Sequence, residues 1–298
     1  SKYVISTLES IYRQNYEGPL ELLIGDDCST DNTADICDKW IEAHKARFVR
    51  AEVARYPENV GSSRNHDILS RKAKGEWIKF IAGDDILGDD ALTTLYTYAV
   101  DGNKTKCFVS SAVRTFSCEE QLASPESCPV MCGDKPLIVD LDYVFRHPLF
   151  FLPAPSFFLN RKALESIGYY PLLLRNVEDA PLMYSFLAFG YRLYHTTTPT
   201  VFYRVHDKSI TRGAGHVFLA GQRDIAIRSI LLPCYDLFKQ TYLKLFYYPI
   251  QYMVKTENKN RVRYKAIKLA TKIIRYIYVA LFFPLLMRKC KVGGRVTD

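Results

Sequence analysis

The order of apolar and polar segments in residues 1–85 constrains the fold of this chain more than any other feature. Short apolar segments at 20–24, 48–53 and 77–81 alternate with segments whose apolar residues recur at helical spacing. Loops of Asp, Asn, Ser and Gly separate each apolar segment from the next helix. This alternation predicts an α/β fold with a mixed, mainly parallel sheet flanked by helices.

Composition excludes disorder for most of the chain and localises the charge. Of 298 residues, 48% are hydrophobic, which is enough to bury a full core. The net charge is +8, but residues 255–298 contain twelve Lys and Arg against Glu257 and Asp298. That segment therefore carries +10, and the first 254 residues carry −2. The basicity belongs to the C-terminal part and not to the predicted α/β domain.

Two acidic pairs follow predicted strands directly. Asp26 and Asp27 come after the first, and Asp84 and Asp85 after the third. Ligands of open α/β sheets gather beyond the carboxyl ends of the strands, so both pairs are candidates for binding a nucleotide or a divalent cation. Each pair can equally be a turn or helix cap. The pairs alone do not separate these interpretations.

Three further segments contain polar residues that can do chemistry. Gly61 opens a helix that carries Arg64 and Asn65, a pattern that suits phosphate but is common before helices. Glu178-Asp179 precedes an apolar helical face and can be a general base or a charged first turn. His206 follows the last predicted strand and can bind a metal or simply complete the core.

These signals, in this order, resemble the inverting family 2 glycosyltransferases of the GT-A fold. The resemblance covers residues 1–211 and is specific as a combination. The matching segments are Leu22-Leu23-Ile24-Gly25-Asp26-Asp27-Cys28-Ser29-Thr30-Asp31-Asn32-Thr33, Asn59-Val60-Gly61 with Arg64-Asn65, Gly75-Glu76-Trp77-Ile78, Ala82-Gly83-Asp84-Asp85, Glu178-Asp179-Ala180-Pro181-Leu182 and Tyr203-Arg204-Val205-His206 with Ser209.

The resemblance implies a nucleotide-sugar site. Asp26 or Asp27 is expected to hold the base, and Gly61, Arg64 and Asn65 are expected near the ribose and diphosphate. The resemblance also implies a metal site for Mn²⁺ or Mg²⁺ and a catalytic base. The expected metal-site residues are Asp84, Asp85 and His206, and Asp84 is also expected to contact the nucleotide sugar. The expected catalytic residues are Asp179 and its neighbour Glu178.

The chain departs from the family pattern at two points. Ala82 stands at the first position of the DxD-type motif, so ribose contacts expected there must come from elsewhere. The family's first buried strand does not precede the helix that opens at Ser1. Because that strand is central, we expect a slot in the sheet, and a chain that is either truncated or no longer competent.

The expected domain organisation is a GT-A domain over residues 1–212 and a basic helical extension over 213–298. The longest uncharged run of the extension, residues 276–287, contains Pro284 and is too short to span a bilayer. Basic clusters on both sides of it favour an interfacial helix on anionic lipid. A helix packed on the catalytic domain and an oligomer contact are the alternatives. No nucleic-acid-binding motif accompanies the charge, so we do not expect nucleic acid as a partner.

The expected function is transfer of a hexose or N-acetylhexosamine, with inversion, from a nucleotide sugar, most simply UDP-linked. The acceptor is expected to be a polysaccharide or a lipid-linked glycan. The protein is expected in the cytoplasm, attached peripherally to the inner face of the cell membrane. The few cysteines and the absence of a signal peptide at the start favour the cytosol. An incompetent glycosyltransferase-like binding protein at a membrane is the alternative. A nucleotidyltransferase is a third option, against which Glu178-Asp179 argues.

Overall fold

The structure is a computed structural model that describes residues 2–102, 105–132, 135–147, 150–206, 221–222, 224–255, 261–286, 291–292 and 295–296. The chain divides into two compact units. The first comprises residues 1–138, 151–182 and 192–206, and the second comprises 139–150, 183–191 and 207–298. The second unit thus takes in residues 139–150, 183–191 and 207–212, which the sequence analysis assigned to the first domain.

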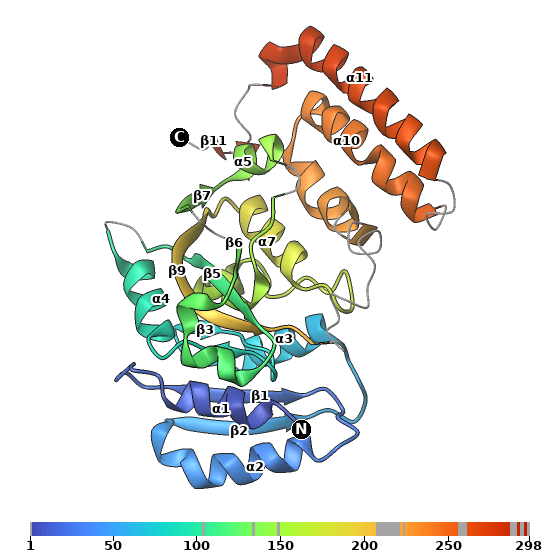
Figure 1. Ribbon diagram of the computed structural model, residues 1–298. Coiled ribbons are helices and arrows are strands. Elements are labelled where there is room, and N and C mark those ends of the chain that lie inside the picture. Colours follow the sequence, from blue (N-terminus) through green and yellow to red (C-terminus); the bar gives the residue numbers. More distant parts are fainter. Residues whose placement is uncertain are drawn as a thin grey trace. The chain divides into compact units, whose positions relative to one another are not determined.

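The first unit begins with a small α/β layer. It consists of α1 (Val4–Tyr12), β1 (Glu21–Asp26), α2 (Thr33–His44) and β2 (Arg50–Arg55), and β1 pairs with β2 in parallel (Figure 1). Apolar residues at helical spacing on α1 and α2 meet one face of this pair. Their buried cluster is Val4, Leu8, Leu22, Cys37, Trp40 and Phe48. The predicted opening of helix, strand, helix and strand is confirmed.

The rest of the first unit is built on a larger sheet. Its strands are β3 (Trp77–Lys79), β4 (Ile86–Leu87), β5 (Phe108–Phe116), β6 (Val130–Cys132), β7 (Leu137–Val139), β8 (Phe158–Asn160) and β9 (Leu193–Arg204). The order is β3-β8-β5-β9-β4, with β6 on β5 and β7 on β9. Helices α3 (Ser62–Lys72), α4 (Ala91–Val100) and α6 (Arg161–Ser166) connect these strands.

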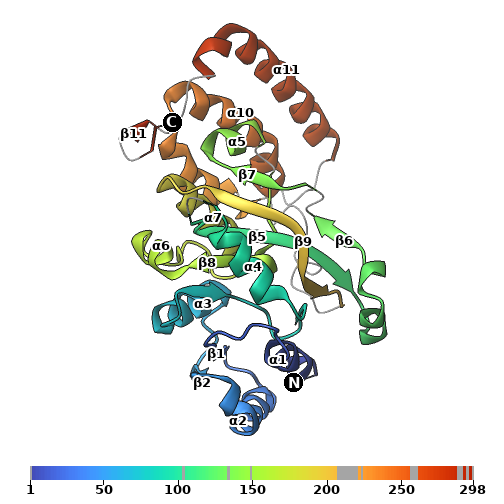
Figure 2. The same ribbon diagram turned by 90° about the vertical axis from the view of Figure 1, so that its left-hand side faces the viewer.

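The large sheet is mixed, as expected, but more antiparallel than the sequence suggested. β5 and β9 are parallel, whereas β3 and β5 pair antiparallel to β8, and β4 pairs antiparallel to β9. The long parallel pair forms the centre, and α4 packs against it (Figure 2). Leu95 and Ala99 of α4 are fully buried there beside Val109.

The two sheets of the first unit are separate. Among the described residues, β1 forms a ladder only with β2, and β3 only with β8. One edge of β1 and one edge of β3 therefore have no ladder partner in the described part of the chain. This interruption matches the slot that the sequence analysis expects.

The second unit is mainly helical and contains α5 (Leu141–Arg146), the last part of α7 (Asp179–Ala188), α10 (Leu237–Lys255) and α11 (Arg261–Leu286). Its core holds Lys239, whose Nζ donates to Asp142 over 3.0 Å. α11 is kinked at Phe282, two residues before Pro284, which has no backbone N–H to donate to the helix. A short strand pair, β10 (Lys291–Val292) with β11 (Arg295–Val296), was not predicted. In the described residues, no helix combines the length and apolarity needed to cross a membrane.

Replacing Gly25 by Ala should destabilise the contact between β1 and α3. An added Cβ would lie 2.0 Å from Oδ1 of Asn65. The Asn65 amide donates to the Gly25 carbonyl and accepts from the Tyr56 hydroxyl, so moving it breaks two hydrogen bonds. We expect Gly25→Ala to lower the free energy of unfolding in urea by about 1–3 kcal/mol.

Gly83→Ala is the matched control for this experiment, because a Cβ there meets nothing closer than Val4 Cγ2 at 4.0 Å. Its unfolding free energy should stay within about 0.5 kcal/mol of the parent. If both variants lost the same unfolding free energy, the close approach of Asn65 to β1 would not be the reason that residue 25 must be glycine.

Candidate active site

The first acidic pair divides into two roles at the end of β1. Both carboxylate oxygens of Asp27 accept backbone N–H groups, from Val60 at 2.6 Å and Gly61 at 3.0 Å. Asp27 therefore holds the loop that leads into α3. The Asp26 carboxylate accepts only a long hydrogen bond from Ser29 N, 3.3 Å, among the contacts described. Of the two candidates for the nucleotide base, Asp26 is the more available.

The loop before α3 packs against the segment before α7. Gly61 has φ +85°, and a Cβ there would lie 2.5 Å from Arg175 Cγ. The Ser62 hydroxyl donates to the Glu178 carboxylate, and Ser63 N donates to the Arg175 carbonyl. Two motifs that are more than one hundred residues apart in the sequence are thus in direct contact.

The described contacts of Arg64 and Asn65 are with other parts of the protein, although both residues were expected near the ribose and diphosphate. Arg64 is exposed, and its Nη1 lies 3.6 Å from Asp67 in the next turn of α3. Asn65 ties α3 to β1 through the Gly25 carbonyl. Neither side chain lines the cavity described next, and their contact with a donor stays a prediction.

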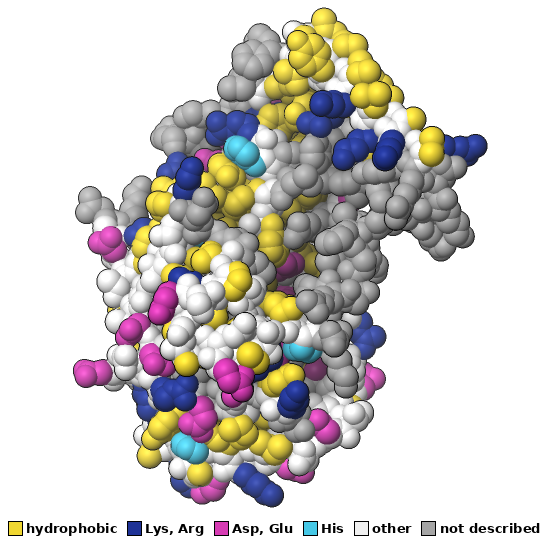
Figure 3. Space-filling view, in the orientation of Figure 1, with side chains coloured by type: hydrophobic (Ala, Val, Ile, Leu, Met, Phe, Trp, Pro, Cys, Tyr) yellow, Lys and Arg dark blue, Asp and Glu magenta, His cyan; other side chains and the backbone are white. Residues whose placement is uncertain are grey.

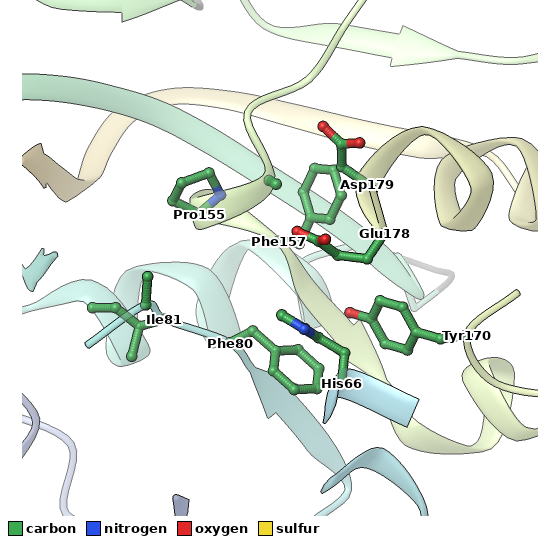
Figure 4. A pocket seen from close by; sticks show the side chains of 10 residues that line it. His66, Phe80, Ile81, Pro155, Phe157, Tyr170, Glu178 and Asp179 are labelled. Carbon is green, nitrogen blue, oxygen red and sulfur yellow. The ribbon is translucent and has the colours of Figure 1, made fainter. Parts of the chain in front are cut away.

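A cavity lies between the segment that follows β3 and the start of α7. Its empty space, including the part open to solvent, is about 520 Å³. Its lining is His66, Phe80, Ile81, Ala82, Ala154, Pro155, Phe157, Tyr170, Glu178 and Asp179. Figure 4 shows the side chains of Glu178 and Asp179 on one side of this space, with His66 and Phe80 on the other.

Hydrogen bonding and charge set the polarity of the cavity wall. Nδ1 of His66 lies 2.7 Å from the Ser62 carbonyl, so this nitrogen carries a proton, and in the neutral ring Nε2 is an acceptor. Burial, assisted by the charges of Glu178 and Asp179, raises the pKa of Tyr170 well above its usual value. Tyr170 therefore keeps its hydroxyl proton beside the two carboxylates.

The second acidic pair also divides into two roles. Oδ2 of Asp84 lies 2.9 Å from Nε2 of His206, and both side chains are partly exposed. Asp85 is fully buried, and one of its oxygens accepts the backbone N–H of Arg204 at 2.9 Å. Burial raises the pKa of Asp85 to about 7, and the neighbouring Asp84 charge adds to this effect.

Arg204 holds the Asp84–Asp85 turn in place, a role that the sequence analysis missed. Its guanidinium is 3% exposed and lies between the rings of Tyr3 and Phe116, at 4.3 and 4.4 Å. Nε donates to the Asp84 carbonyl at 2.8 Å, and Nη2 donates to Glu119 at 3.1 Å. The end of β9 is thereby fixed to the turn that carries Asp84.

The donor chemistry at Asp84 and His206 fits a divalent cation that completes its shell with substrate oxygens. Mg²⁺ and Mn²⁺ favour carboxylate and phosphate oxygens and are often held by one or two protein ligands. Within the described part of the chain, no group of three or more His, Cys, Asp or Glu side chains is placed to hold a metal. The expected triad of Asp84, Asp85 and His206 is not found as such, because Asp85 lies in the core against β9.

Lys79 is a second residue that the sequence analysis missed. Its ammonium donates to the carbonyls of Phe80 and Pro155, which belong to two walls of the cavity. Desolvation lowers the pKa of Lys79 to about 7, against the attraction of Asp85. A lysine inside the otherwise apolar Trp77–Ile81 run was the signal available in the sequence.

The fold is that of a glycosyltransferase of the GT-A type, and the sequence comparisons agree. The profile of the family described as glycosyl transferase family 2 matches residues 1–168, and the chain belongs to this family. The chain is 25% identical over 225 residues to the glycosyltransferase GlyG of Streptococcus pneumoniae, covering 71% of this chain and 69% of that protein.

A shorter sequence match involves the poly(ribitol-phosphate) β-N-acetylglucosaminyltransferase TarS of Staphylococcus aureus. It is 26% identical over 92 residues, which are 30% of this chain and 15% of TarS.

Solved structures show the same fold. Residues 1–349 of S. aureus TarS in complex with UDP-GlcNAc superpose with a TM-score of 0.65 at 15% identity, covering 96% of this chain and 83% of that one. The mannosyltransferase PcManGT of Pyrobaculum calidifontis, in complex with GDP-Man and Mn²⁺, gives a TM-score of 0.50 at 17% identity, with coverage of 96% and 84%.

Arg204→Met should destabilise the protein because it leaves the Asp84 carbonyl without this donor and removes a buried cation that contacts two aromatic rings. We expect the free energy of unfolding to fall by about 1–3 kcal/mol in urea denaturation. Glu119→Gln, which weakens the solvent-exposed half of the same ion pair, should change it by less than about 1 kcal/mol. Similar losses in both variants would mean that the ion pair, and not the anchoring of the turn, matters.

Proposed function

We propose that this glycosyltransferase is an inverting enzyme that uses a UDP-linked hexose or N-acetylhexosamine. The observation that most directly supports this proposal is that Glu178 and Asp179 line the same cavity as Ala82, which lies two residues before Asp84. A candidate base and the approach to a candidate diphosphate site therefore face the same cavity. The UDP-GlcNAc complex of TarS and the description of TarS as an N-acetylglucosaminyltransferase support this choice of donor.

The proposed donor site runs from β1 to the turn after β3. Asp26 contacts the base, and the loop at Gly61, held by Asp27, lies beside the ribose and diphosphate. Arg64 adds positive charge near the diphosphate when its side chain turns away from Asp67, to which it is only weakly paired. Asn65 acts through the backbone by fixing α3 on β1.

The proposed transfer is a single displacement at the anomeric carbon. Asp179 accepts the proton of the acceptor hydroxyl as its oxygen bonds to the anomeric carbon, and the bond from that carbon to the diphosphate oxygen breaks. The products are the glycosylated acceptor with inverted configuration, UDP and protonated Asp179. Glu178 is held in place beside Asp179 by the Ser62 hydroxyl, which donates to its carboxylate.

Asp84 and His206 are the residues that would hold the metal in this proposal. A divalent cation there, Mn²⁺ or Mg²⁺, would neutralise the charge that develops on the leaving diphosphate. The Mn²⁺ in the GDP-Man complex of PcManGT supports this assignment. The buried Asp85 shapes the turn rather than reaching the cation.

The proposed acceptor is the hydroxyl of a polysaccharide or a lipid-linked glycan, and the proposed place is the cytoplasmic face of the cell membrane. The poly(ribitol-phosphate) acceptor named for TarS supports a polymeric acceptor, and the protein would then serve polysaccharide biosynthesis. The positive charge of residues 255–298 supports peripheral attachment to an anionic surface.

Asp179→Asn should abolish transfer and leave the donor site intact, since the amide cannot accept the acceptor's proton. We expect kcat to fall by about 10²–10⁴-fold in a UDP-release assay, with UDP affinity by calorimetry unchanged. Asp89→Asn, an exposed carboxylate of the same unit, is the control and should retain full activity. Undiminished turnover in Asp179→Asn would reject the base. A parent protein that binds UDP but transfers no sugar from a panel of donors would favour the binding-protein alternative.

Asp84→Ala should remove the metal dependence of nucleotide binding. Calorimetry with UDP in the presence of MnCl₂ should show an affinity at least about tenfold weaker than the parent, and no further loss on adding EDTA. Asp89→Ala should keep the parent's response to EDTA. Unchanged metal-dependent affinity in Asp84→Ala would exclude this carboxylate as a ligand.

A further inference from the structure

The outer face of α11 carries a continuous apolar surface. The large exposed side chains on it are between 49% and 78% accessible. They are Val262, Leu269, Ile273, Ile274, Tyr276, Ile277 and Leu281. Figure 3 shows hydrophobic side chains gathered along this helix, next to Lys and Arg side chains. An apolar surface of this kind marks an interaction site more often than a solvated one.

The opposite face of α11 is already occupied by α10. Thr271 is buried, Tyr278 donates to the Phe238 carbonyl, and Arg275 donates to the Tyr242 hydroxyl at 2.6 Å. Positions 271, 275 and 278 share one face at 3.6 residues per turn, whereas 269, 273, 276 and 277 lie on the other. The helix hairpin therefore buries one side of α11 and presents a second apolar side outward.

The charge beside the outer apolar surface has one sign. α11 contains six Lys and Arg and no Asp or Glu. Lys265, Lys268 and Lys272 are exposed and recur three and four residues apart, so they form a row along one flank of the apolar surface. A second copy of the chain seated on this face would bring two such rows of like charge together, which is unfavourable. An anionic surface is complementary to the row.

We propose that the outer face of α11 binds in the plane of an anionic lipid bilayer surface. Leu269, Ile273 and Ile277 enter the interface between headgroups and acyl chains, while Lys265, Lys268 and Lys272 contact lipid phosphates. This inference rests on the proposed placement of the enzyme at a membrane and defines the surface responsible. It does not involve the transfer reaction, so the two proposals can fail separately.

The test is co-sedimentation of the full chain with vesicles of phosphatidylcholine alone or with about one third phosphatidylglycerol. The parent should bind the anionic vesicles, and binding should weaken as salt is raised. Leu269→Ser/Ile273→Ser/Ile277→Ser should lower the partition coefficient at least about tenfold. Lys265→Gln/Lys268→Gln/Lys272→Gln should lower it about fivefold for each lysine.

The matched control is Lys39→Gln/Lys74→Gln/Lys162→Gln, which makes the same change in net charge at exposed lysines of the first unit. Its partition coefficient should equal that of the parent. Equal losses in the two lysine variants would overturn the proposal, since binding would then follow net charge and not α11. Far-UV circular dichroism should show unchanged helix content in every variant, because all substituted side chains are exposed.

Two further outcomes would also overturn the proposal. Equal binding of the parent and the apolar-face variant would show that α11 does not enter the interface. A lipid-free dimer in sedimentation velocity that dissociates in the apolar-face variant would assign the surface to a second copy. UDP affinity, measured on the same variants, should remain that of the parent, so loss of lipid binding is separable from damage to the donor site.

Discussion

The buried guanidinium of Arg204 is the constraint on which the site depends. Taking an arginine out of water costs several kcal/mol unless its donors and charge are compensated. Here Glu119 balances the charge, the Asp84 carbonyl accepts from Nε, and two aromatic rings cover the planar faces. This compensation needs α1, the end of β5 and the turn after β3 to converge at one point. The position of Asp84 opposite His206 follows from that convergence.

In both acidic pairs, the two carboxylates differ in their contacts. In each pair, one carboxylate organises backbone: Asp27 holds the loop at Gly61, and Asp85 holds β9. The other carboxylate, Asp26 or Asp84, makes fewer backbone contacts among those described, and it is the one that we propose contacts the donor or the metal. A pair of adjacent carboxylates is thus a way to place one reactive group accurately, because its neighbour fixes the turn that carries it.

Sequence reasoning succeeded where the signal is local and failed where it depends on distant partners. Helical spacing placed α1 and α2, and the acidic turns marked the ends of β1 and β3. The antiparallel pairings of β8 could not be predicted, since a three-residue strand shows no direction in its pattern. Arg204 was missed because its partners lie on other elements. Lys79 stands out in its apolar segment, but its second acceptor, the Pro155 carbonyl, is distant in the sequence. The split roles of Asp26 and Asp27 also became visible only from hydrogen-bond partners.

Because the two sheets of the first unit are separate, side chains of other elements must fix their relative position. The proposed donor site needs Asp26 of the small sheet and Asp84 beyond β3 of the large sheet at a fixed separation, yet no ladder joins β1 to β3 in the described residues. The link is made instead by side chains on other elements. On α1, Thr7 donates to the Asp85 carbonyl and Ser10 accepts the Leu87 N–H. The Glu21 carboxylate accepts N–H groups of Lys74 and Gly75 just before β3, and Asn65 donates to the Gly25 carbonyl. Such contacts are individually worth about 1 kcal/mol. The separation of Asp26 and Asp84 in the proposed donor site is therefore fixed by the packing of α1 and by these hydrogen bonds, and not by a sheet ladder.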